Sequence, residues 1–222
     1  MSYALLAVAI ACAALDWIAA EKRWRRIEYA TKPLVMLLLL AWLWQAGGMR
    51  GWMVWFVAGM IFSLAGDILL MLPRDLFIGG LAAFLVAQVA YIAGFNSSVP
   101  LVTPGGVAVA VVLGIVVWRI YARIAGALKE KNATALAAPL LAYTIVLGLM
   151  VLSAMLTFFR PEWARMHALL VSCGGALFLA SDGMLAWNRF VAPVPHARLL
   201  IMATYHLAQF GIVIGAALHL LG

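Results

Sequence analysis

The sequence predicts an all-α membrane protein with eight transmembrane helices, organised as a single integral membrane domain over residues 1–222. Hydrophobic residues make up 67% of the 222 residues and charged residues only 10%, whereas soluble domains contain about 45–50% and about 25%. The mean hydropathy is +1.08. Eight apolar stretches approach the length of about 20 residues that a spanning helix needs. The linkers between them are too short for a soluble domain.

The first four predicted spans are each bounded by charged or helix-breaking residues. They lie at 3–20, 32–48, 52–72 and 76–97. The first leads directly into a basic cluster that begins at Lys22; it lacks the basic leader of a signal peptide, so we expect an uncleaved helix. The second opens at Lys32-Pro33, where proline suits the first turn of a helix. Pro73 and Pro100 follow the third and fourth spans.

Proline also marks the last four predicted spans. They lie at 101–119, 136–158, 164–188 and 198–221. Pro104 with two glycines stands near the start of the fifth, Pro161 follows the sixth, and Pro193 and Pro195 separate the seventh from the eighth. Such residues are typical of the turns between helices.

The basic residues predict the orientation of the chain in the membrane. If the first loop faces the cytoplasm, twelve of the 15 lysines and arginines share that side: Lys22, Arg23, Arg25, Arg26, Lys32, Arg74, Arg119, Arg123, Lys129, Lys131, Arg189 and Arg198. Only Arg50, Arg160 and Arg165 lie on the other. Cytoplasmic loops are enriched in basic residues. We therefore expect an inner (cytoplasmic) membrane protein with both termini outside the cytoplasm. The net charge of +7 is explained by this topology, and no nucleic-acid partner is expected.

Short matches between the two halves raise the possibility of two parallel four-helix repeats. Residues 63–67 resemble residues 178–182, and Ala87-Gln88 resembles Ala208-Gln209. A unit with an even number of spans repeats with the same orientation.

Two carboxylates inside apolar stretches are the main candidates for catalysis. Asp67 and Asp182 are each followed seven residues later by an arginine, Arg74 and Arg189. At a helical rise of about 1.5 Å per residue, both acids lie roughly 10 Å inside the membrane surface. A charged side chain there costs about 2.5–3.5 kcal/mol even on a lenient scale, so such residues are usually functional. The matched depth predicts one shared site. The alternative is a structural role, with each acid satisfied by neighbouring groups.

Further polar residues of the spans are candidates for substrate binding. They are Lys32, Gln88, Tyr91, Tyr143, Tyr205, His206 and Gln209. Lys32 is either an interfacial cation that extends to the headgroups or a group that binds phosphate or pairs with an acid. A histidine in a span is often a packing residue. Asp16 lies near the end of the first span, close to Glu21, and is expected to be interfacial.

Known catalytic and metal-binding motifs are absent from the sequence. It contains no His-Glu-x-x-His motif, no Gly-x-Ser-x-Gly elbow, no phosphate loop and no dinucleotide fingerprint. Asp67, Asp182 and His206 could together hold a metal, but we expect neither metal nor cofactor. Two neighbouring buried acids titrate apart, so one is protonated while the other is ionised. Such a pair suits a reaction with an oxocarbenium-like transition state. The matching lipid chemistry is hydrolysis of a vinyl ether, but the spacing of the acids alone does not single out that substrate.

The chain resembles the YhhN-type lysoplasmalogenase family, which are eight-span membrane hydrolases. The matching stretches are Thr31-Lys32-Pro33-Leu34, Phe62-Ser63-Leu64-Ala65-Gly66-Asp67-Ile68-Leu69-Leu70, Gly80-Leu81-Ala82-Ala83-Phe84, Phe178-Leu179-Ala180-Ser181-Asp182 and Thr204-Tyr205-His206-Leu207-Ala208-Gln209. The resemblance implies cleavage of the alkenyl ether of lysoplasmalogens, with a lysophospholipid substrate and membrane lipids as partners. The family's two aspartates correspond to Asp67 and Asp182.

This sequence departs from the family pattern at two places. Gln88 stands three residues before Tyr91, where the family usually has histidine, and Tyr205-His206 replaces two adjacent tyrosines. Because glutamine does not titrate, a role for position 88 in proton transfer is weakened. The rival hypotheses are a proton-coupled transporter that uses the same acids as a relay and a lipid-binding protein without catalysis.

Overall fold

A computed structural model describes residues 3–98 and 102–222, which form a bundle of long helices. The α-helices are α1 (Tyr3–Lys22), α2 (Arg25–Gln45), α3 (Met53–Met71), α4 (Phe77–Phe95), α5 (Pro104–Glu130), α6 (Ala137–Leu156), α7 (Arg165–Phe190) and α8 (Ala197–Leu220). Two short 3₁₀ turns, Thr134–Leu136 and Thr157–Phe159, flank α6. All eight of these helices are long and apolar enough to cross a membrane, which confirms the predicted fold class.

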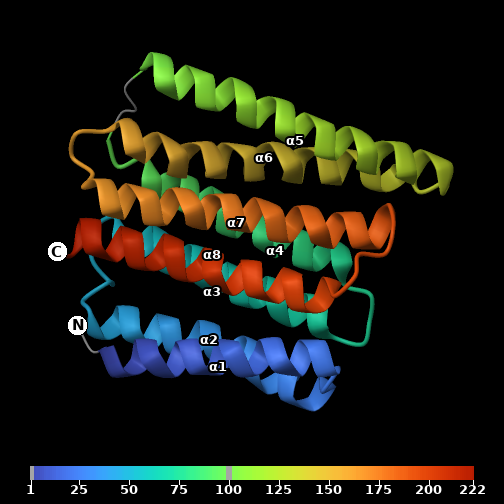
Figure 1. Cartoon of the computed structure of the whole chain (residues 1–222), viewed down its shortest axis with the longest axis horizontal. Helices are drawn as coiled ribbons and strands as arrows, with labels where there is room; N and C mark the ends of the chain where they lie inside the picture. The colour runs from blue at the N-terminus through green and yellow to red at the C-terminus, as the bar shows by residue number, and fades with distance from the viewer. Residues whose placement is uncertain (1–2, 99–101) are drawn as a thin grey trace.

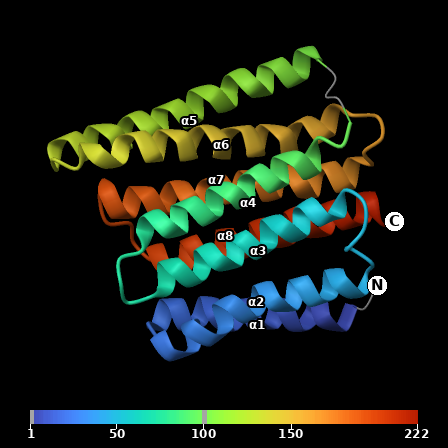
Figure 2. The ribbon, with the colours of Figure 1, turned by 180° about the vertical axis from the view of Figure 1, so that it is seen from behind.

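The helices are arranged as two edge pairs and a central group of four. The pair α1 and α2 lies at one edge, α5 and α6 lie at the opposite edge, and α3, α4, α7 and α8 lie between them (Figures 1 and 2). Each half of the chain thus supplies one edge pair and one central pair. This arrangement is compatible with two units related by an axis along the membrane normal, while the duplication itself stays a prediction.

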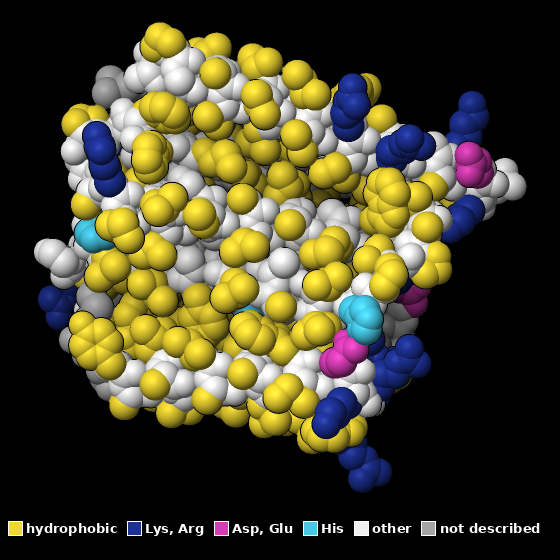
Figure 3. Space-filling model, in the orientation of Figure 1, with side chains coloured by type: hydrophobic (Ala, Val, Ile, Leu, Met, Phe, Trp, Pro, Cys, Tyr) yellow, Lys and Arg dark blue, Asp and Glu magenta, His cyan; other side chains and the backbone are white. Residues whose placement is uncertain are grey.

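The two ends of the bundle differ in charge. Both chain termini lie at the same end (Figure 1). Lysine and arginine side chains gather at the opposite end (Figure 3), which carries the connections 23–24, 72–76, 131–136 and 191–196. We call this the basic end.

Glycine residues allow the backbones of the central helices α7 and α8 to touch. A Cβ added to Gly174 would lie 2.7 Å from the backbone nitrogen of Ile212, and one added to Gly211 would lie 2.9 Å from the carbonyl oxygen of Leu170. Both positions therefore require glycine. Close approach at small residues is a main source of helix association in membranes, because lipid tails are as apolar as leucine. The α7–α8 contact is the most extensive between helices of the described residues.

Two predicted boundaries are wrong. The second helix begins at Arg25, not at 32. Pro33 therefore lies inside α2 instead of in its first turn, and Lys32 lies almost two turns from the helix start. The fifth helix continues to Glu130, so Arg123 and Lys129, which lie beyond the predicted end at 119, belong to a helix and not to a loop.

Candidate active site

A polar cavity of about 480 Å³ opens at the basic end between α1, α2, α3, α7 and α8. Its polar lining consists of Asp16, Arg25, Glu28, Tyr29, Lys32, Asp67, Ser181, Asp182, Asn188, Arg189, Arg198 and Tyr205. The structure thus brings Asp67 and Asp182, from α3 and α7, to one cavity. Lys32 and Tyr205 line it with them.

Each carboxylate oxygen of Asp67 has a hydrogen-bond donor. Lys32 Nζ lies 2.9 Å from its Oδ1, and the Tyr205 hydroxyl donates to its Oδ2 at 2.7 Å. Both Asp67 and Lys32 are buried, at 1% and 7% exposure. The burial rules out the interpretation of Lys32 as an interfacial cation, because the ammonium is directed into the bundle toward a carboxylate. An isolated buried charge is costly, and this pairing together with the hydroxyl offsets that cost.

Packing of aromatic rings fixes the position of Tyr205. The ring contacts Phe84 of α4 and Phe178 of α7, both edge to face, with ring centroids 5.8 Å away in each case. The Lys32 ammonium lies 5.8 Å from the centre of the same ring, within the range of a cation–π interaction. The phenol is therefore held with its hydroxyl on Asp67.

The hydrogen-bond partners of Asp182 among the described residues are all neutral. The Tyr143 hydroxyl donates to its Oδ2, and Gln88 Nε2 donates to the same oxygen at 3.4 Å. None of the salt bridges within the described residues involves Asp182. Its other oxygen has no hydrogen-bond partner among the side chains and backbone that the structure describes. The two acids of one cavity therefore lie in different electrostatic surroundings.

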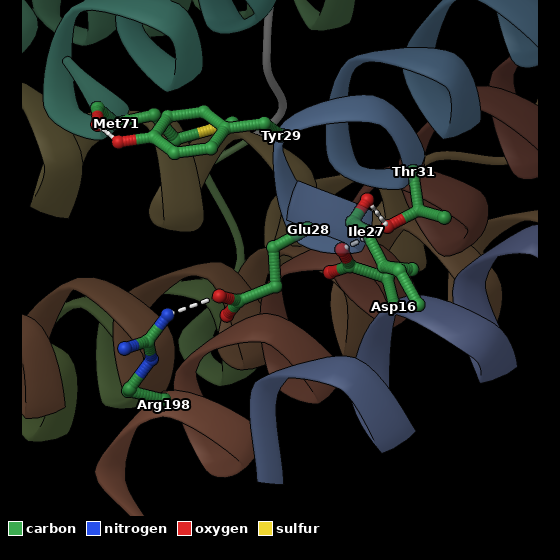
Figure 4. A network of polar contacts seen from close by, with 7 residues as sticks. All are labelled: Asp16, Ile27, Glu28, Tyr29, Thr31, Met71 and Arg198. Carbon is green, nitrogen blue, oxygen red and sulfur yellow. Dashed lines mark hydrogen bonds and ion pairs between the residues drawn. The ribbon is translucent and has the colours of Figure 1, made fainter. Parts of the chain in front are cut away.

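The mouth of the cavity is stabilised by contacts between helices (Figure 4). Arg198 of α8 pairs with Glu28 of α2, and the Tyr29 hydroxyl donates to the Met71 carbonyl at 2.8 Å. On the α7 side, Arg189 pairs with Asp75 at 2.7 Å. By contrast, no ion pair within the described part of the chain involves the exposed Arg25.

Asp16 is a third aspartate that lines the cavity, while its expected interfacial depth stays a prediction. It is 1% exposed and accepts a hydrogen bond from the Thr31 hydroxyl at 2.6 Å, whose oxygen also lies 2.9 Å from the Ile27 carbonyl (Figure 4). Its Oδ2 has no hydrogen-bond partner among the described residues. One signal could have found it: Ala9, Ala13 and Ala20 share its helical face and are buried with it.

The other predicted binding residues surround the cavity without lining it. The Tyr91 hydroxyl donates to Gln209 Oε1 at 2.7 Å, a buried link between α4 and α8. His206 Nδ1 accepts a hydrogen bond from Trp17 Nε1 at 3.1 Å. Among the described residues, Gln88, Tyr91, His206 and Gln209 contribute no wall to the polar cavity, and their roles in binding stay predictions.

The positions of Asp67, Asp182 and His206 do not form the metal site that was the alternative for these residues. Over residues 3–98 and 102–222, no three histidine, cysteine, aspartate or glutamate side chains are grouped closely enough to hold an ion. Asp67 is instead engaged by Lys32, and the His206 ring by Trp17.

Comparison with known proteins decides the family. The sequence profile of the YhhN family matches residues 27–216. The chain belongs to the YhhN family. The match runs from α2 to near the end of α8 and includes Lys32, Asp67 and Asp182, while Asp16 precedes it.

Several YhhN-type relatives carry names that state an activity. Lysoplasmalogenase TMEM86B of Homo sapiens is 31% identical over 202 residues, which cover 91% of this chain and 76% of that protein. The Mus musculus lysoplasmalogenase TMEM86B is 28% identical over 205 residues, or 91% and 80%. Lysoplasmalogenase TMEM86A of Homo sapiens is 32% identical over 161 residues, or 71% and 63%. No solved structure matches the chain.

Proposed function

We propose that this protein is a lysoplasmalogenase-like hydrolase. It cleaves the vinyl-ether bond of a lysoplasmalogen to a fatty aldehyde and a glycerophospho-headgroup. The names of the relatives support the reaction class. The observation that carries the mechanism is that two intramembrane acids line one cavity, one paired with a lysine and the other with neutral groups.

The surroundings of the two acids assign their roles. An ionised carboxylate is stabilised by an adjacent cation and by hydrogen bonds, which are the partners of Asp67. A carboxyl withdrawn from bulk water without a cation beside it is cheaper to keep neutral than charged, which is the situation of the half-buried Asp182. We therefore assign Asp182 as the general acid and Asp67 as the base and cation stabiliser.

The proposed reaction then needs four proton transfers and one water. Asp182 donates its proton to the alkenyl carbon remote from the ether oxygen, which leaves an oxocarbenium ion at the adjacent carbon. Asp67 stabilises that cation and accepts a proton from the water that attacks it. The resulting hemiacetal passes its hydroxyl proton to Asp182 and breaks its carbon–oxygen bond to the glycerol, whose oxygen takes up the proton from Asp67. The products are an aldehyde and an alcohol, and the acid pair returns to its starting state.

The cavity mouth provides cations for the substrate's phosphate. The Lys32 ammonium is buried against Asp67, and Arg74 does not line the polar cavity. The exposed Arg25 and Arg189 do line it, Arg189 with its Nη2 also on Asp75. We assign the headgroup phosphate to these two arginines, since guanidinium groups match phosphate oxygens in pairs.

We further infer that the basic end faces the cytoplasm, so that both termini lie on the other side of an inner (cytoplasmic) membrane. Reporter fusions test this orientation. A phosphatase fused to the C-terminus, which is active only outside the cytoplasm, is expected to be active. An inactive phosphatase fusion together with a fluorescent cytoplasmic reporter at the same position would reverse the orientation.

The decisive experiment is the release of fatty aldehyde from alkenyl lysophosphatidylethanolamine by detergent-solubilised protein. Asp67→Asn and Asp182→Asn are each expected to lower kcat/KM by about 10²–10⁴-fold, the usual size of acid–base contributions. Glu162→Gln, at the opposite end of the bundle, is the matched control and is expected to keep wild-type activity. Near-normal turnover in both aspartate variants would contradict the site. Absence of aldehyde from folded wild type, with substrate counterflow in liposomes, would favour the transporter.

A further inference from the structure

Asp182 lines a second, apolar pocket in addition to the polar cavity. This pocket of about 40 Å³ lies between α4, α5, α6 and α7, and its polar groups are only Asp182, Tyr143 and Thr144. Leu70, Phe84 and Leu185 line both spaces. The carboxyl of Asp182 therefore stands at the junction of a polar space and an apolar one.

An apolar groove lies on the outer side of the same helix. It has a volume of about 390 Å³ and runs between α5 and α7. Its wall is apolar and includes Val116 and Ile120 of α5 and Leu179, Gly183 and Trp187 of α7. Figure 3 shows a hollow covered by hydrophobic side chains below α5, the uppermost helix in that view. A groove with this lining at membrane depth faces lipid chains.

The groove and the pocket meet at a narrow seam. Ile120, Leu179 and Gly183 line both. A Cβ added to Gly183 would meet a single neighbouring atom, Ile120 Cδ1, at 3.9 Å. At the seam the Ile120 side chain therefore stands opposite a residue that has none. α5 is also loosely held, since only Gly106, Leu113, Ile124 and Leu128 of its 27 residues are buried.

We propose that the α5–α7 seam admits the hydrocarbon chain of the substrate sideways from the membrane. The chain lies in the outer groove, crosses between Ile120 and Gly183, and reaches the apolar pocket with its alkenyl ether at Asp182. The glycerophosphate then extends into the polar cavity. This proposal rests on the proposed function and names the chain subsite of the same active site.

The outer groove, the apolar pocket and the polar cavity are continuous. This continuity supports the substrate's hydrocarbon chain as the occupant of the groove, in preference to a structural lipid that remains outside the seam. The spaces are linked through Asp182, Ile120 and Gly183, and their polarity changes in the order in which a single-chain lysolipid changes along its length. A chain that moves from membrane to groove leaves one apolar surrounding for another. The seam therefore contributes little affinity and acts by positioning the reacting carbons.

Filling the seam tests the proposal by activity. Gly183→Phe places a ring where the chain would cross, and Gly114→Phe, at a position of α5 with nothing within 4 Å of an added Cβ, is the matched control. We expect Gly183→Phe to lower kcat/KM for a long-chain alkenyl lysolipid by about 10²-fold, the size of effect that poor positioning causes. For an analogue whose chain ends inside the pocket, Gly183→Phe is expected to lower kcat/KM far less. Gly114→Phe is expected to leave the ratio of kcat/KM between the two substrates unchanged. An unchanged ratio in folded Gly183→Phe would overturn the proposal.

A photolabel tests the same route without turnover. The probe is a saturated alkyl-ether lysophospholipid with a diazirine at the chain end, which has no alkenyl carbon to protonate. Adducts on the α5 and α7 residues of the groove are expected in wild type and reduced in Gly183→Phe. Adducts confined to the polar cavity would overturn the proposal. Because labelling does not require hydrolysis, a wild type that labels the groove and releases no aldehyde would reject the proposed function and retain the chain subsite.

Discussion

The two halves of the molecule hold their acids in the same arrangement of helices, which we call the frame. Asp67 of α3 is contacted by Lys32 of α2 and Tyr205 of α8, and Asp182 of α7 is contacted by Tyr143 of α6 and Gln88 of α4. In each half, the acid lies on the third helix. Its partners come from the second helix of its own half and the fourth helix of the other half.

The difference between the halves lies in the residues that this frame carries. The second helix supplies a lysine to Asp67 and a tyrosine to Asp182, and only the first of these is a cation. One frame can therefore hold one ionised and one neutral acid, which is the division of labour that acid–base catalysis uses. Substitutions at the partners test whether this contrast is real.

Removal of the cation is expected to have the largest effect on stability. Lys32→Met leaves Asp67 buried without its ion pair, a change that typically costs about 3–5 kcal/mol of unfolding free energy. Denaturant-induced unfolding in detergent measures it. The control is the double variant Lys32→Met with Asp67→Asn, in which no buried charge remains. This variant is expected to recover most of the lost stability and no activity. Equal stability of the single and double variants would mean that Asp67 is not charged beside Lys32.

The two tyrosines provide the next comparison. Tyr205→Phe removes a hydrogen bond to an acid that we assign as ionised and is expected to cost about 1.5–3 kcal/mol, whereas Tyr143→Phe removes one to a neutral acid and is expected to cost about 0.5–1.5 kcal/mol. Both substitutions keep the ring, so packing changes little. Unfolding of the two variants under one condition compares them directly, and a larger cost for Tyr143→Phe would reverse the assignment of acid and base.

The smallest effect is expected at the surface link between the halves. The guanidinium of Arg189 donates hydrogen bonds to Asp75 and attracts its charge, and the backbone N–H of Phe77 adds a further bond; together these hold the pKa of the Asp75 carboxyl below its usual range. The stabilisation is therefore complete above the unfolded pKa of about 3.9 and is lost as pH falls through the folded value. Asp75→Asn is expected to lower the unfolding temperature slightly at pH 7, by an amount that shrinks in acid and in high salt. If Asp75→Asn still lowers the unfolding temperature in strong acid, the charge of the Arg189–Asp75 pair is not the source of the stabilisation.

The long apolar runs were sufficient to predict the helices, because a span needs length and hydropathy and little else. The exact ends were harder to predict. At α2, the residues 25–31 are polar enough to read as a loop, yet Glu28 and Thr31 find partners in α8 and α1. At α5, the helix continues past the apolar part of the sequence and carries its arginines with it.

The acids of the candidate site could be predicted from the sequence for a related physical reason, while the site itself stays a proposal. Asp67 and Asp182 are visible in the sequence because a charge is costly inside an apolar run. Their different partners were not visible, since Lys32, Tyr143 and Tyr205 come from other helices and meet the acids only in the folded bundle. Asp16 was not predicted to line the cavity because its neighbour in the sequence, Glu21, suggested a solvated position, whereas its neighbour in space is Thr31.

The glycine contact between α7 and α8 has a consequence for the order in which the protein opens. Its backbone amides lie where two helices touch without intervening side chains, while α5 covers the edge with few buried residues. Local opening is cheapest where few buried contacts are broken. In hydrogen–deuterium exchange, the amides of α5 should therefore exchange first and those around Gly174 and Gly211 last. The side of the bundle that carries the apolar groove then opens locally, while α7 and α8, which carry Asp182 and Tyr205, stay folded.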